Sequence, residues 1–431
     1  MFRPDSLKSQ YQDEEVDAIE QKSEHLEHVR LSDGKWRYCR GYHTRHVQKR
    51  PFVKAAVRLE WDLALATLEA CAGFESPITV TPMKAILPFI LIITATACSS
   101  SPSGQSPPVP SGFSISDRLV IESDGTYNST PAVAQAENGD WVLSYRKGLD
   151  HVDSPLVILR RSQDHGQTWS PEAVYFDTSQ PDPTLALTPD GRLLIEFVKL
   201  DPNGVAGSAY SLSQDNGLTW GAFTFFDNPV SNTYAFPTSF LTVAGTMYAA
   251  SYGPHGDGTD DSTLWDSVDS GTSWIKGSVI RQATDAGINE TAIAEVGPRT
   301  FLAVSRDDLN TNTWAHFSDD SGVTWGNQID YTPQVGVLQL PQLIQAGNAL
   351  LLFGRQFNPT AFPNQFVVFA SFDGGMTFTD RTVLDTYTGE SIDGGYCWPL
   401  LMGDGNVFVV YYGDSHNLRQ PDIKSLVLQL G

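Results

Sequence analysis

The chain of 431 residues is long enough for two or three domains, so composition has to indicate how it is organised. Hydrophobic residues make up 41% of it and charged residues only 18%, with abundant glycine and aromatic residues, which is typical of all-β proteins rich in turns. The net charge of −22 falls entirely on residues 113–431, where 15 Lys and Arg oppose 37 Asp and Glu. Such an acidic surface repels phosphate backbones and anionic lipids, which argues against nucleic acid as a partner.

A secretion signal lies well inside the chain. Met83 and Lys84 precede a run of apolar or small residues, 85–97, which ends at Cys98. One positive charge, a short apolar run and a small-residue cleavage site are typical of such signals, and Ala-Thr-Ala-Cys98 resembles a bacterial lipobox. We therefore expect 83–98 to be a lipoprotein signal peptide with Cys98 as the lipidated residue, and 99–112 to be a Ser/Pro-rich linker.

This interpretation also predicts the fate of the first residues and the location of the protein. Residues 1–82 mix Glu, Arg and His without clear periodicity, and we expect them to be a mis-called N-terminal extension that is not part of the fold. The remaining protein is expected in the bacterial cell envelope, lipid-anchored in the outer membrane or periplasm, or secreted. Contact with a membrane is expected only through the lipid anchor.

One short motif occurs five times in residues 113–431. Each copy reads Ser-x-Asp-x-Gly-x-Thr/Ser-aromatic, and the steps between successive Asp residues are 51, 54, 51 and 53 residues. The copies are Ser162–Trp169, Ser213–Trp220, Ser267–Trp274, Ser318–Trp325 and Ser371–Phe378. The pattern predicts a tight β-hairpin turn, because the Asp carboxylate accepts backbone N–H bonds, the Gly adopts a positive φ and the aromatic ring packs beneath. These copies are Asp boxes, and we assign them a folding role and no chemistry.

The spacing of the boxes predicts the fold. A period of about 52 residues suits one four-stranded propeller blade, and residues 113–431 suffice for six of them. Ile115–Ser123 and Ile423–Leu430 are the predicted strands that close the ring. We therefore predict an all-β protein whose 113–431 region is a six-bladed β-propeller.

Hairpin registers predict which distant residues meet. Counting outward from the turn at Pro298 sets Glu290 opposite Arg306. The same count places Arg146 near Pro131, Arg355 near Leu340-Pro341 and Tyr396 near Gly413-Asp414, with Asp182 and Tyr252 at equivalent strand ends. In a propeller these ends converge on one mouth of the central channel, so we predict a site there.

The boxes, the Asn289-Glu290 to Arg306 hairpin, Arg355 and the Gly-Gly-Tyr396 stretch together resemble the sialidase superfamily over essentially all of 113–431. In sialidases a Tyr nucleophile is activated by a Glu, a loop Asp is the acid/base, and three Arg clamp the substrate carboxylate. The resemblance implies Tyr396 as nucleophile, Glu290 as its partner, and Arg306 and Arg355 as clamp members. The acid/base is then Asp150 or Asp153, with Asp150 slightly favoured.

The resemblance implies an exo-acting glycoside hydrolase that removes a terminal acidic sugar from glycans with retention and needs no cofactor or metal. A phenol suits an anionic sugar, because a carboxylate nucleophile would be repelled by the charge of the substrate. The four cysteines form no C-x-x-C pair and no His cluster indicates a metal site. We expect a monomer.

One position departs from the family pattern. Sialidases open the first blade with Arg-Ile-Pro, whereas this chain has Ser129-Thr130-Pro131, so the first clamp Arg is absent. Arg146 is a candidate replacement, with His151 beside it. Two alternatives therefore stay open: a polysaccharide lyase on uronic-acid glycans with His151 or a Tyr as base, and a non-catalytic glycan-binding propeller.

Overall fold

The computed structural model of the protein describes residues 24–30, 36–42, 113–151, 153–177, 182–200, 206–226, 236–254, 260–281, 287–357, 364–387, 394–413 and 420–430. The chain divides into two compact units, Met1–Gly104 and Gln105–Gly431. In the first unit, β1 (Glu24–Arg30) and β2 (Trp36–Tyr42) form a two-stranded antiparallel sheet that the sequence analysis did not predict. The predicted signal peptide with Cys98 and the linker lie outside the described residues.

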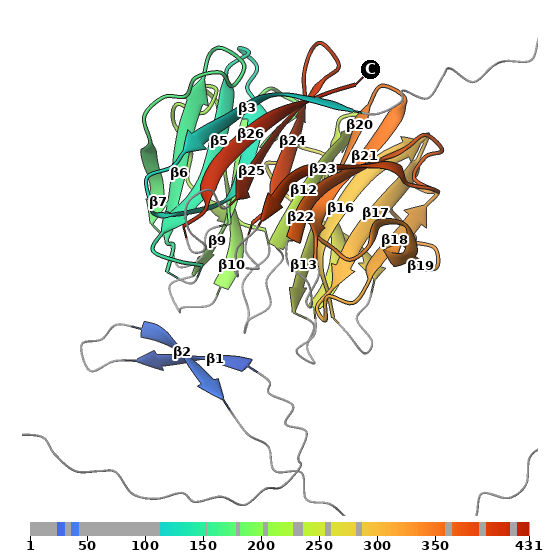
Figure 1. Ribbon diagram of the computed structural model, residues 1–431, viewed down its shortest axis with the longest axis horizontal. Helices are drawn as coiled ribbons and strands as arrows, with labels where there is room; N and C mark the ends of the chain where they lie inside the picture. Colours follow the sequence, from blue (N-terminus) through green and yellow to red (C-terminus); the bar gives the residue numbers. More distant parts are fainter. Residues whose placement is uncertain are drawn as a thin grey trace, which may run out of the picture. The chain divides into compact units, whose positions relative to one another are not determined.

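The second unit consists of six four-stranded antiparallel sheets, the blades (Figure 1). Blades one to three are β4 (Tyr127–Gln135), β5 (Trp141–Gly148), β6 (Leu156–Ser162), β7 (Ala173–Asp177); β8 (Thr184–Leu187), β9 (Leu193–Leu200), β10 (Ala206–Ser213), β11 (Thr224–Phe225); and β12 (Phe236–Val243), β13 (Thr246–Pro254), β14 (Asp260–Ser267), β15 (Ile275–Arg281). Blades four to six are β16 (Ile288–Gly297), β17 (Thr300–Asp307), β18 (Thr313–Ser318), β19 (Ile329–Asp330); β20 (Leu338–Ala346), β21 (Ala349–Gln356), β22 (Asn364–Ser371), β23 (Thr379–Tyr387); and β24 (Cys397–Leu401), β25 (Val407–Gly413), β26 (Asp422–Gln429), β3 (Ser114–Glu122). The predicted six-bladed all-β propeller is confirmed.

The ring closes through two strands from opposite ends of the propeller region. β3 pairs antiparallel with β26 as the fourth strand of blade six, and Figure 1 shows the teal β3 beside the red β26. The first strands of successive blades also contact one another around the ring, from β4 through β8, β12, β16, β20 and β24 back to β4. The predicted closing strands are thus paired with each other.

The five Asp boxes have the structure that their sequence predicts. In the first box, Asp164 Oδ1 accepts a 2.8 Å bond from the Thr168 backbone N–H, and Ser162 Oγ accepts one of 2.8 Å from the Gly166 N–H. The same contacts recur in the other four boxes, and each box Gly has a positive φ. Hydrogen bonds from Thr168 lower the pKa of Asp164 to about 2. Each box therefore fixes the turn between the third and fourth strands of its blade.

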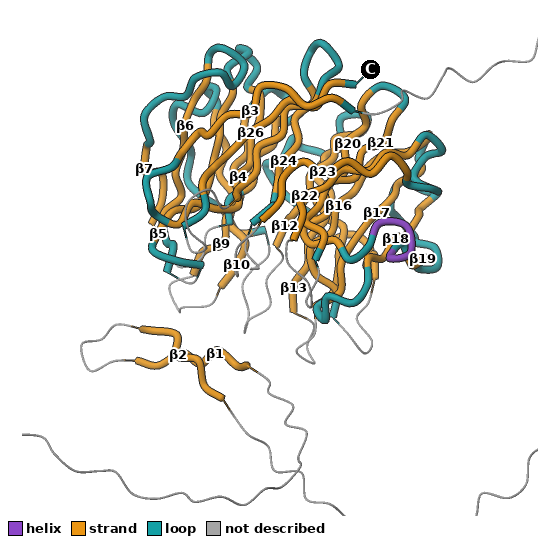
Figure 2. Tube along the Cα trace, in the orientation of Figure 1, coloured by secondary structure: helices purple, strands orange, loops and turns teal. Residues whose placement is uncertain are grey.

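Stacked blades bury the strands on both faces. All of β25 is buried, and one apolar cluster joins Val133, Trp141 and Leu143 of blade one to Phe408 and Val410 of blade six. Strands that are buried on both faces have largely apolar sequences. This is why apolar and polar residues alternate little along β9, β21 and β25. The one helix among the described residues, α1 (Thr332–Val335), is the purple turn in Figure 2. No described helix is long and apolar enough to cross a membrane.

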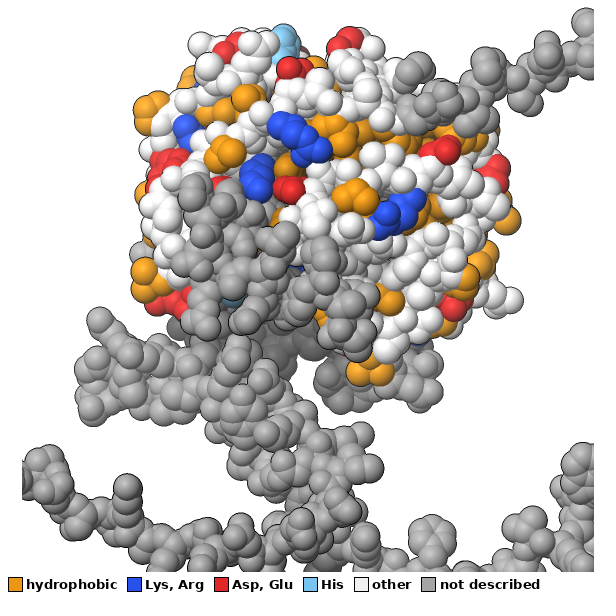
Figure 3. All heavy atoms as spheres, in the orientation of Figure 1, with side chains coloured by type: hydrophobic (Ala, Val, Ile, Leu, Met, Phe, Trp, Pro, Cys, Tyr) orange, Lys and Arg blue, Asp and Glu red, His pale blue; other side chains and the backbone are white. Residues whose placement is uncertain are grey.

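The two edges of the ring differ. Turns between first and second strands and the Asp boxes lie at one edge, the box edge. At the other edge each first strand begins and each second strand ends, and we call this edge the mouth. On the face drawn in Figure 3, described Lys and Arg side chains are scattered and form no continuous band.

Candidate active site

Glu290 joins three blades at the mouth. Its Oε1 accepts a hydrogen bond of 2.7 Å from the Tyr396 hydroxyl and one of 3.3 Å from Nη2 of Arg306. Its Oε2 accepts a 3.0 Å bond from the backbone N–H of Leu340 and forms an ion pair with Nε of Arg306. The structure therefore brings Glu290 and Arg306 together as the hairpin count placed them, and Tyr396 joins them from 106 residues further along the chain.

A bulge at the start of β16 directs the Glu290 side chain. Thr291 pairs with Ser305, but the next pair is Ile288 with Asp307, so the chain between them steps out of the ladder. The carboxylate is nearly buried, at 5% exposure. The bulge lets the Glu290 carboxylate reach the Tyr396 hydroxyl of blade six while it stays paired with Arg306 of its own sheet.

Two glycines position Tyr396. Gly394 and Gly395 have φ values of 132° and 75°, and the Gly395 N–H donates a 2.7 Å bond to the Tyr412 carbonyl. A Cβ at Gly395 would lie 3.0 Å from the ring and hydroxyl of buried Tyr387, so a side chain there would disturb this packing. The Tyr396 ring then packs edge-on against Tyr412, with centroids 5.9 Å apart.

Arg355 lies beside the Tyr396 ring, with its guanidinium carbon 5.0 Å from the ring centroid. Its Nη1 donates a 2.8 Å bond to the Gly394 carbonyl, and its Nε and Nη2 both donate to Oε1 of Gln339. The hairpin count placed Arg355 near Leu340-Pro341, but a bulge in β20 shifts the strand register, so the ladder partner of Arg355 is a different residue. Leu340 has a φ of 40° and Pro341 has no N–H, so the ladder skips both and Arg355 pairs with Gln339.

The charges around Tyr396 keep its phenol neutral at rest. Burial and the Glu290 carboxylate raise the pKa of Tyr396 well above its ordinary value, against the opposing effect of Arg306 and Arg355. Burial disfavours the charge on Arg306, but Glu290, Tyr396 and Tyr252 outweigh it and raise the pKa of Arg306. Tyr252 therefore lies close enough to Arg306 to influence its charge, as its predicted place at the mouth requires.

A second polar group lies at the mouth in blades one and two. Nη1 of Arg146 forms a 2.9 Å ion pair with Asp182, and Nη2 donates to the His151 carbonyl. Nδ1 of His151 is 2.9 Å from the Tyr127 hydroxyl, and the Arg146 guanidinium lies 5.6 Å from the Tyr127 ring centroid. The structure thus brings three predicted residues together with Tyr127, which the sequence analysis did not select.

The position of the missing clamp Arg is occupied by buried Ser129. Ser129 pairs with Arg146, whereas the hairpin count placed Arg146 near Pro131. The reason is again a bulge, because Thr130 has a φ of 47° and the ladder resumes only at Ala132. Arg146 therefore projects from the strand beside the position where sialidases have their first Arg.

The two candidate acids lie on one short exposed loop. Oδ1 of Asp150 accepts a 2.8 Å bond from the Asp153 N–H, and the Asp153 carbonyl accepts one of 2.6 Å from the Leu149 N–H. The loop closes tightly on Gly148, where a Cβ would lie 2.1 Å from the Cα of Ser154. One oxygen of Asp150 is thus engaged in its own turn, while both carboxylates remain at the surface of the mouth.

Glu196 is a buried acid near the mouth that the sequence analysis missed. It is 0% exposed, and its carboxyl group accepts bonds from Thr184 Oγ1, at 2.8 Å, and from Ser208 Oγ. Burial raises the pKa of Glu196 to about 8, to which the charge of Asp182 adds. The sequence signal for Glu196 is an acidic residue between the apolar residues Ile195 and Phe197 of β9.

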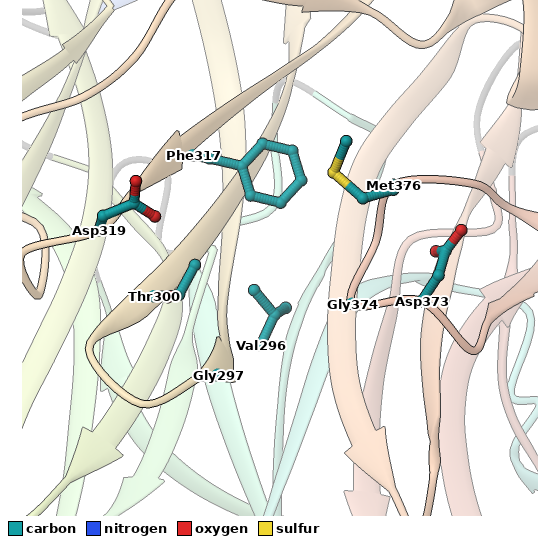
Figure 4. Close-up of a pocket in the computed structure, with 8 residues that line it drawn as sticks. All are labelled: Val296, Gly297, Thr300, Phe317, Asp319, Asp373, Gly374 and Met376. Carbon is teal, nitrogen blue, oxygen red and sulfur yellow. The ribbon is translucent and has the colours of Figure 1, made fainter. Parts of the chain in front are cut away.

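Two further features lie outside this site. The carboxylates of Glu122, Asp124 and Glu172 gather closely enough to hold a cation, but the Lys147 ammonium lies among them, 2.5 Å from Asp124 and 2.7 Å from Glu172. At the box edge, Figure 4 shows a hollow where Phe317 and Met376 face each other across Val296. Val296 lies at the end of its hairpin opposite Glu290, so the hollow is separate from the mouth.

The fold and this mouth define the class: the protein is a six-bladed propeller of the sialidase superfamily. The chain belongs to the family described as BNR repeat-like domain, which matches residues 148–410. That match covers most of the propeller region.

A sialidase of Micromonospora viridifaciens is 24% identical to the chain over 354 residues, which are 69% of this chain and 54% of the relative. The chain thus spans about half the length of this relative. A Hadza microbial sialidase superposes with a TM-score of 0.56 at 18% identity, covering 69% of this chain and 65% of that one. The alpha-L-arabinanase of Penicillium chrysogenum superposes with a TM-score of 0.52 at 15% identity, covering 72% and 98%. All three are glycoside hydrolases, and the two solved structures show a shared fold.

Proposed function

We propose that the protein is an exo-acting glycoside hydrolase that removes a terminal acidic sugar from glycans, with Tyr396 as the nucleophile. The observation that carries the proposal is the 2.7 Å bond from the Tyr396 hydroxyl to Glu290, whose carboxylate Arg306 holds in place. A phenol with a carboxylate partner is an activated nucleophile without a negative charge at rest. Arg355 and Arg306 beside it suit an anionic sugar.

In the first step the Tyr396 oxygen attacks the anomeric carbon while its proton passes to Glu290. A bond forms between the phenol oxygen and the sugar, and the bond to the leaving oxygen breaks. The leaving oxygen takes a proton from Asp150 or Asp153. In the second step the carboxylate of the same Asp takes a proton from water, and the water oxygen attacks the same carbon. The bond to the Tyr396 oxygen breaks and Glu290 returns its proton to the phenolate, so the configuration is retained and both acids are restored.

The second group at the mouth favours one alternative. The hydroxyl of Tyr127 lies 2.9 Å from Nδ1 of His151, with Arg146 beside them. A Tyr–His pair next to a guanidinium is suited to remove a proton adjacent to a carboxylate, which is the step of a uronate lyase. The lyase is therefore the second candidate function.

Covalent trapping distinguishes these candidates. A fluorogenic sialoside and a 3-fluorinated acidic glycosyl donor are incubated with residues 99–431, and digests are analysed by mass spectrometry. We expect fluorophore release and a sugar adduct on the peptide that contains Tyr396, with no adduct in Tyr396→Phe. Uronate polymers that yield an unsaturated, ultraviolet-absorbing product instead would establish the lyase, and inactivity on all substrates would favour a glycan-binding role.

We also propose that a lipid on Cys98 anchors the protein in the cell envelope as a monomer. The support is the lipobox-like sequence that ends at Cys98. Metabolic labelling with a palmitate analogue tests this: label should appear in the native protein, and its presence in Cys98→Ala would contradict the proposal.

A further inference from the structure

Two neutral side chains connect the arginines of the proposed site. Oδ1 of Asn310 accepts a 2.5 Å bond from Nη1 of Arg306 and a 2.7 Å bond from Nε2 of Gln339. Oε1 of Gln339 in turn accepts from Nε and Nη2 of Arg355. A continuous chain of hydrogen bonds therefore runs from Arg306 in blade four to Arg355 in blade five.

The backbone fixes both ends of this connection. Gln339 is buried, at 4% exposure, and the bulge at Leu340-Pro341 sets it directly opposite Arg355. Asn310 has a φ of 54° in the turn between β17 and β18, a conformation that Asn tolerates better than most residues. The two amides are thus held beside the end of β17 and the start of β20.

The neutrality of the connection has a chemical consequence. Each amide uses its oxygen to accept from a guanidinium, and Gln339 uses its nitrogen to reach Asn310, so both functions of the amide are needed. A carboxylate at either position would orient a guanidinium equally well. It would also place a negative charge where the substrate carboxylate has to bind.

We propose that Gln339 and Asn310 form an amide bridge that sets the spacing of Arg306 and Arg355 without adding negative charge, and so determines the preference for a substrate carboxylate. This inference rests on the proposed function. Both residues are positioning residues, since they act through the two arginines.

The test exchanges one amide for the isosteric acid. Gln339→Glu keeps the contact with Arg355 and should therefore fold, but its carboxylate competes with that of the substrate. We expect KM for a fluorogenic sialoside to rise roughly tenfold or more, with kcat changed much less. Asn310→Asp at the more exposed end should raise KM less. Gln345→Glu is the matched control, because Gln345 is exposed on the same strand at the box edge, and its KM should equal that of the native protein.

Two outcomes separate this inference from the proposed function. If the native protein cleaves the sialoside and KM of Gln339→Glu is unchanged, the bridge is refuted and the proposed function stands. If the native protein cleaves nothing, the proposed function fails, and calorimetric titration with N-acetylneuraminate and glucuronate decides on the bridge. Tighter binding of either acid by the native protein than by Gln339→Glu would support the bridge, and equal or absent binding would refute it.

Discussion

The two polar groups at the mouth use the same residue types in different ways. In blades four to six, Glu290 binds both Arg306 and the Tyr396 hydroxyl, so a reactive oxygen is part of the network. In blades one and two, Arg146 is engaged by Asp182 and by a backbone carbonyl. Arg306 is ion-paired as well, so the difference lies in Arg355, which donates to the neutral side chain of Gln339 and to the Gly394 carbonyl.

This difference indicates how the mouth tolerates Ser129 where sialidases have an Arg. Under the proposed function, the nucleophile and the arginines that bind the substrate carboxylate lie on the side of blades four to six. The opposite side supplies a Tyr–His pair and the loop with Asp150 and Asp153. We therefore expect substitutions in blades four to six to affect the nucleophile and carboxylate binding. On the other side, we expect substitutions of the acid/base Asp to affect catalysis and those of Arg146 to affect mainly stability.

The largest effect is expected from Tyr396→Phe, which removes the nucleophilic oxygen and leaves the ring. We expect kcat on a fluorogenic sialoside to fall by about 10³-fold or more. Tyr411→Phe is the control, because that phenol is also buried but bonds to Asp385 instead of Glu290. Equal activities of the two variants would show that Tyr396 is not the nucleophile. The polar group of blades four to six would then no longer differ from that of blades one and two by carrying the nucleophile.

The second-largest effect is expected from Glu196→Gln, and it concerns stability. Glu196 lies near the polar group of blades one and two. The pKa of about 8 in the fold exceeds the ordinary value of 4.5, so the stability that this carboxyl group contributes is full below pH 4.5 and is lost as the pH rises to about 8. Glutamine does not ionise, so we expect the variant to gain about 5 kcal/mol relative to the native protein between about pH 4 and pH 9.

Urea unfolding at several pH values measures this gain. Glu137→Gln is the matched control, since Glu137 is exposed in the turn between β4 and β5. The contrary outcome is a free energy of unfolding that has the same pH dependence in the native protein and in Glu196→Gln. That outcome would mean that Glu196 is ionised in the fold and that the polar group of blades one and two carries an additional negative charge.

Features of the molecule that depend on local contacts can be predicted from the sequence. Each Asp box is a local turn whose contacts span four residues, so five copies at a regular period predict the blades and their number. Glu290 and Arg306 belong to one hairpin, and counting from its turn predicts their side-chain contact, although a bulge takes Glu290 out of the ladder. Local patterns of this kind can be read from one sequence.

The sequence does not predict contacts that depend on a bulge or on a neighbouring blade. The bulges at Thr130 and Leu340 shift the partners of Arg146 and Arg355, and hairpin counting assumes an unbroken ladder. The bridge from Asn310 to Gln339 crosses between blades, and no periodic signal links the two residues. The place of Tyr387 beneath Gly395 likewise depends on packing.

A smaller effect, but one specific to the side of blades four to six, is expected from Arg355→Lys. Lysine keeps the charge but loses the planar fork that binds a carboxylate with two hydrogen bonds. We expect KM for an acidic substrate to rise on the order of 10-fold, with a smaller change in kcat. Arg381→Lys, at an exposed Arg on β23 bound to Gln356, is the control and should match the native protein.

The smallest effect on activity is expected from Arg146→Lys, and it tests the comparison most directly. If Asp182 already satisfies Arg146, lysine keeps the ion pair and KM for the sialoside should change by about threefold or less. The thermal midpoint should fall, because the bond from Nη2 to the His151 carbonyl is lost and the loop bearing both candidate acids loosens. A rise in KM as large as that of Arg355→Lys, at an unchanged midpoint, would instead make Arg146 the third clamp residue. Both sides of the mouth would then bind the substrate carboxylate, and Arg146 would take the role of the first clamp Arg of sialidases, at whose position this chain has Ser129.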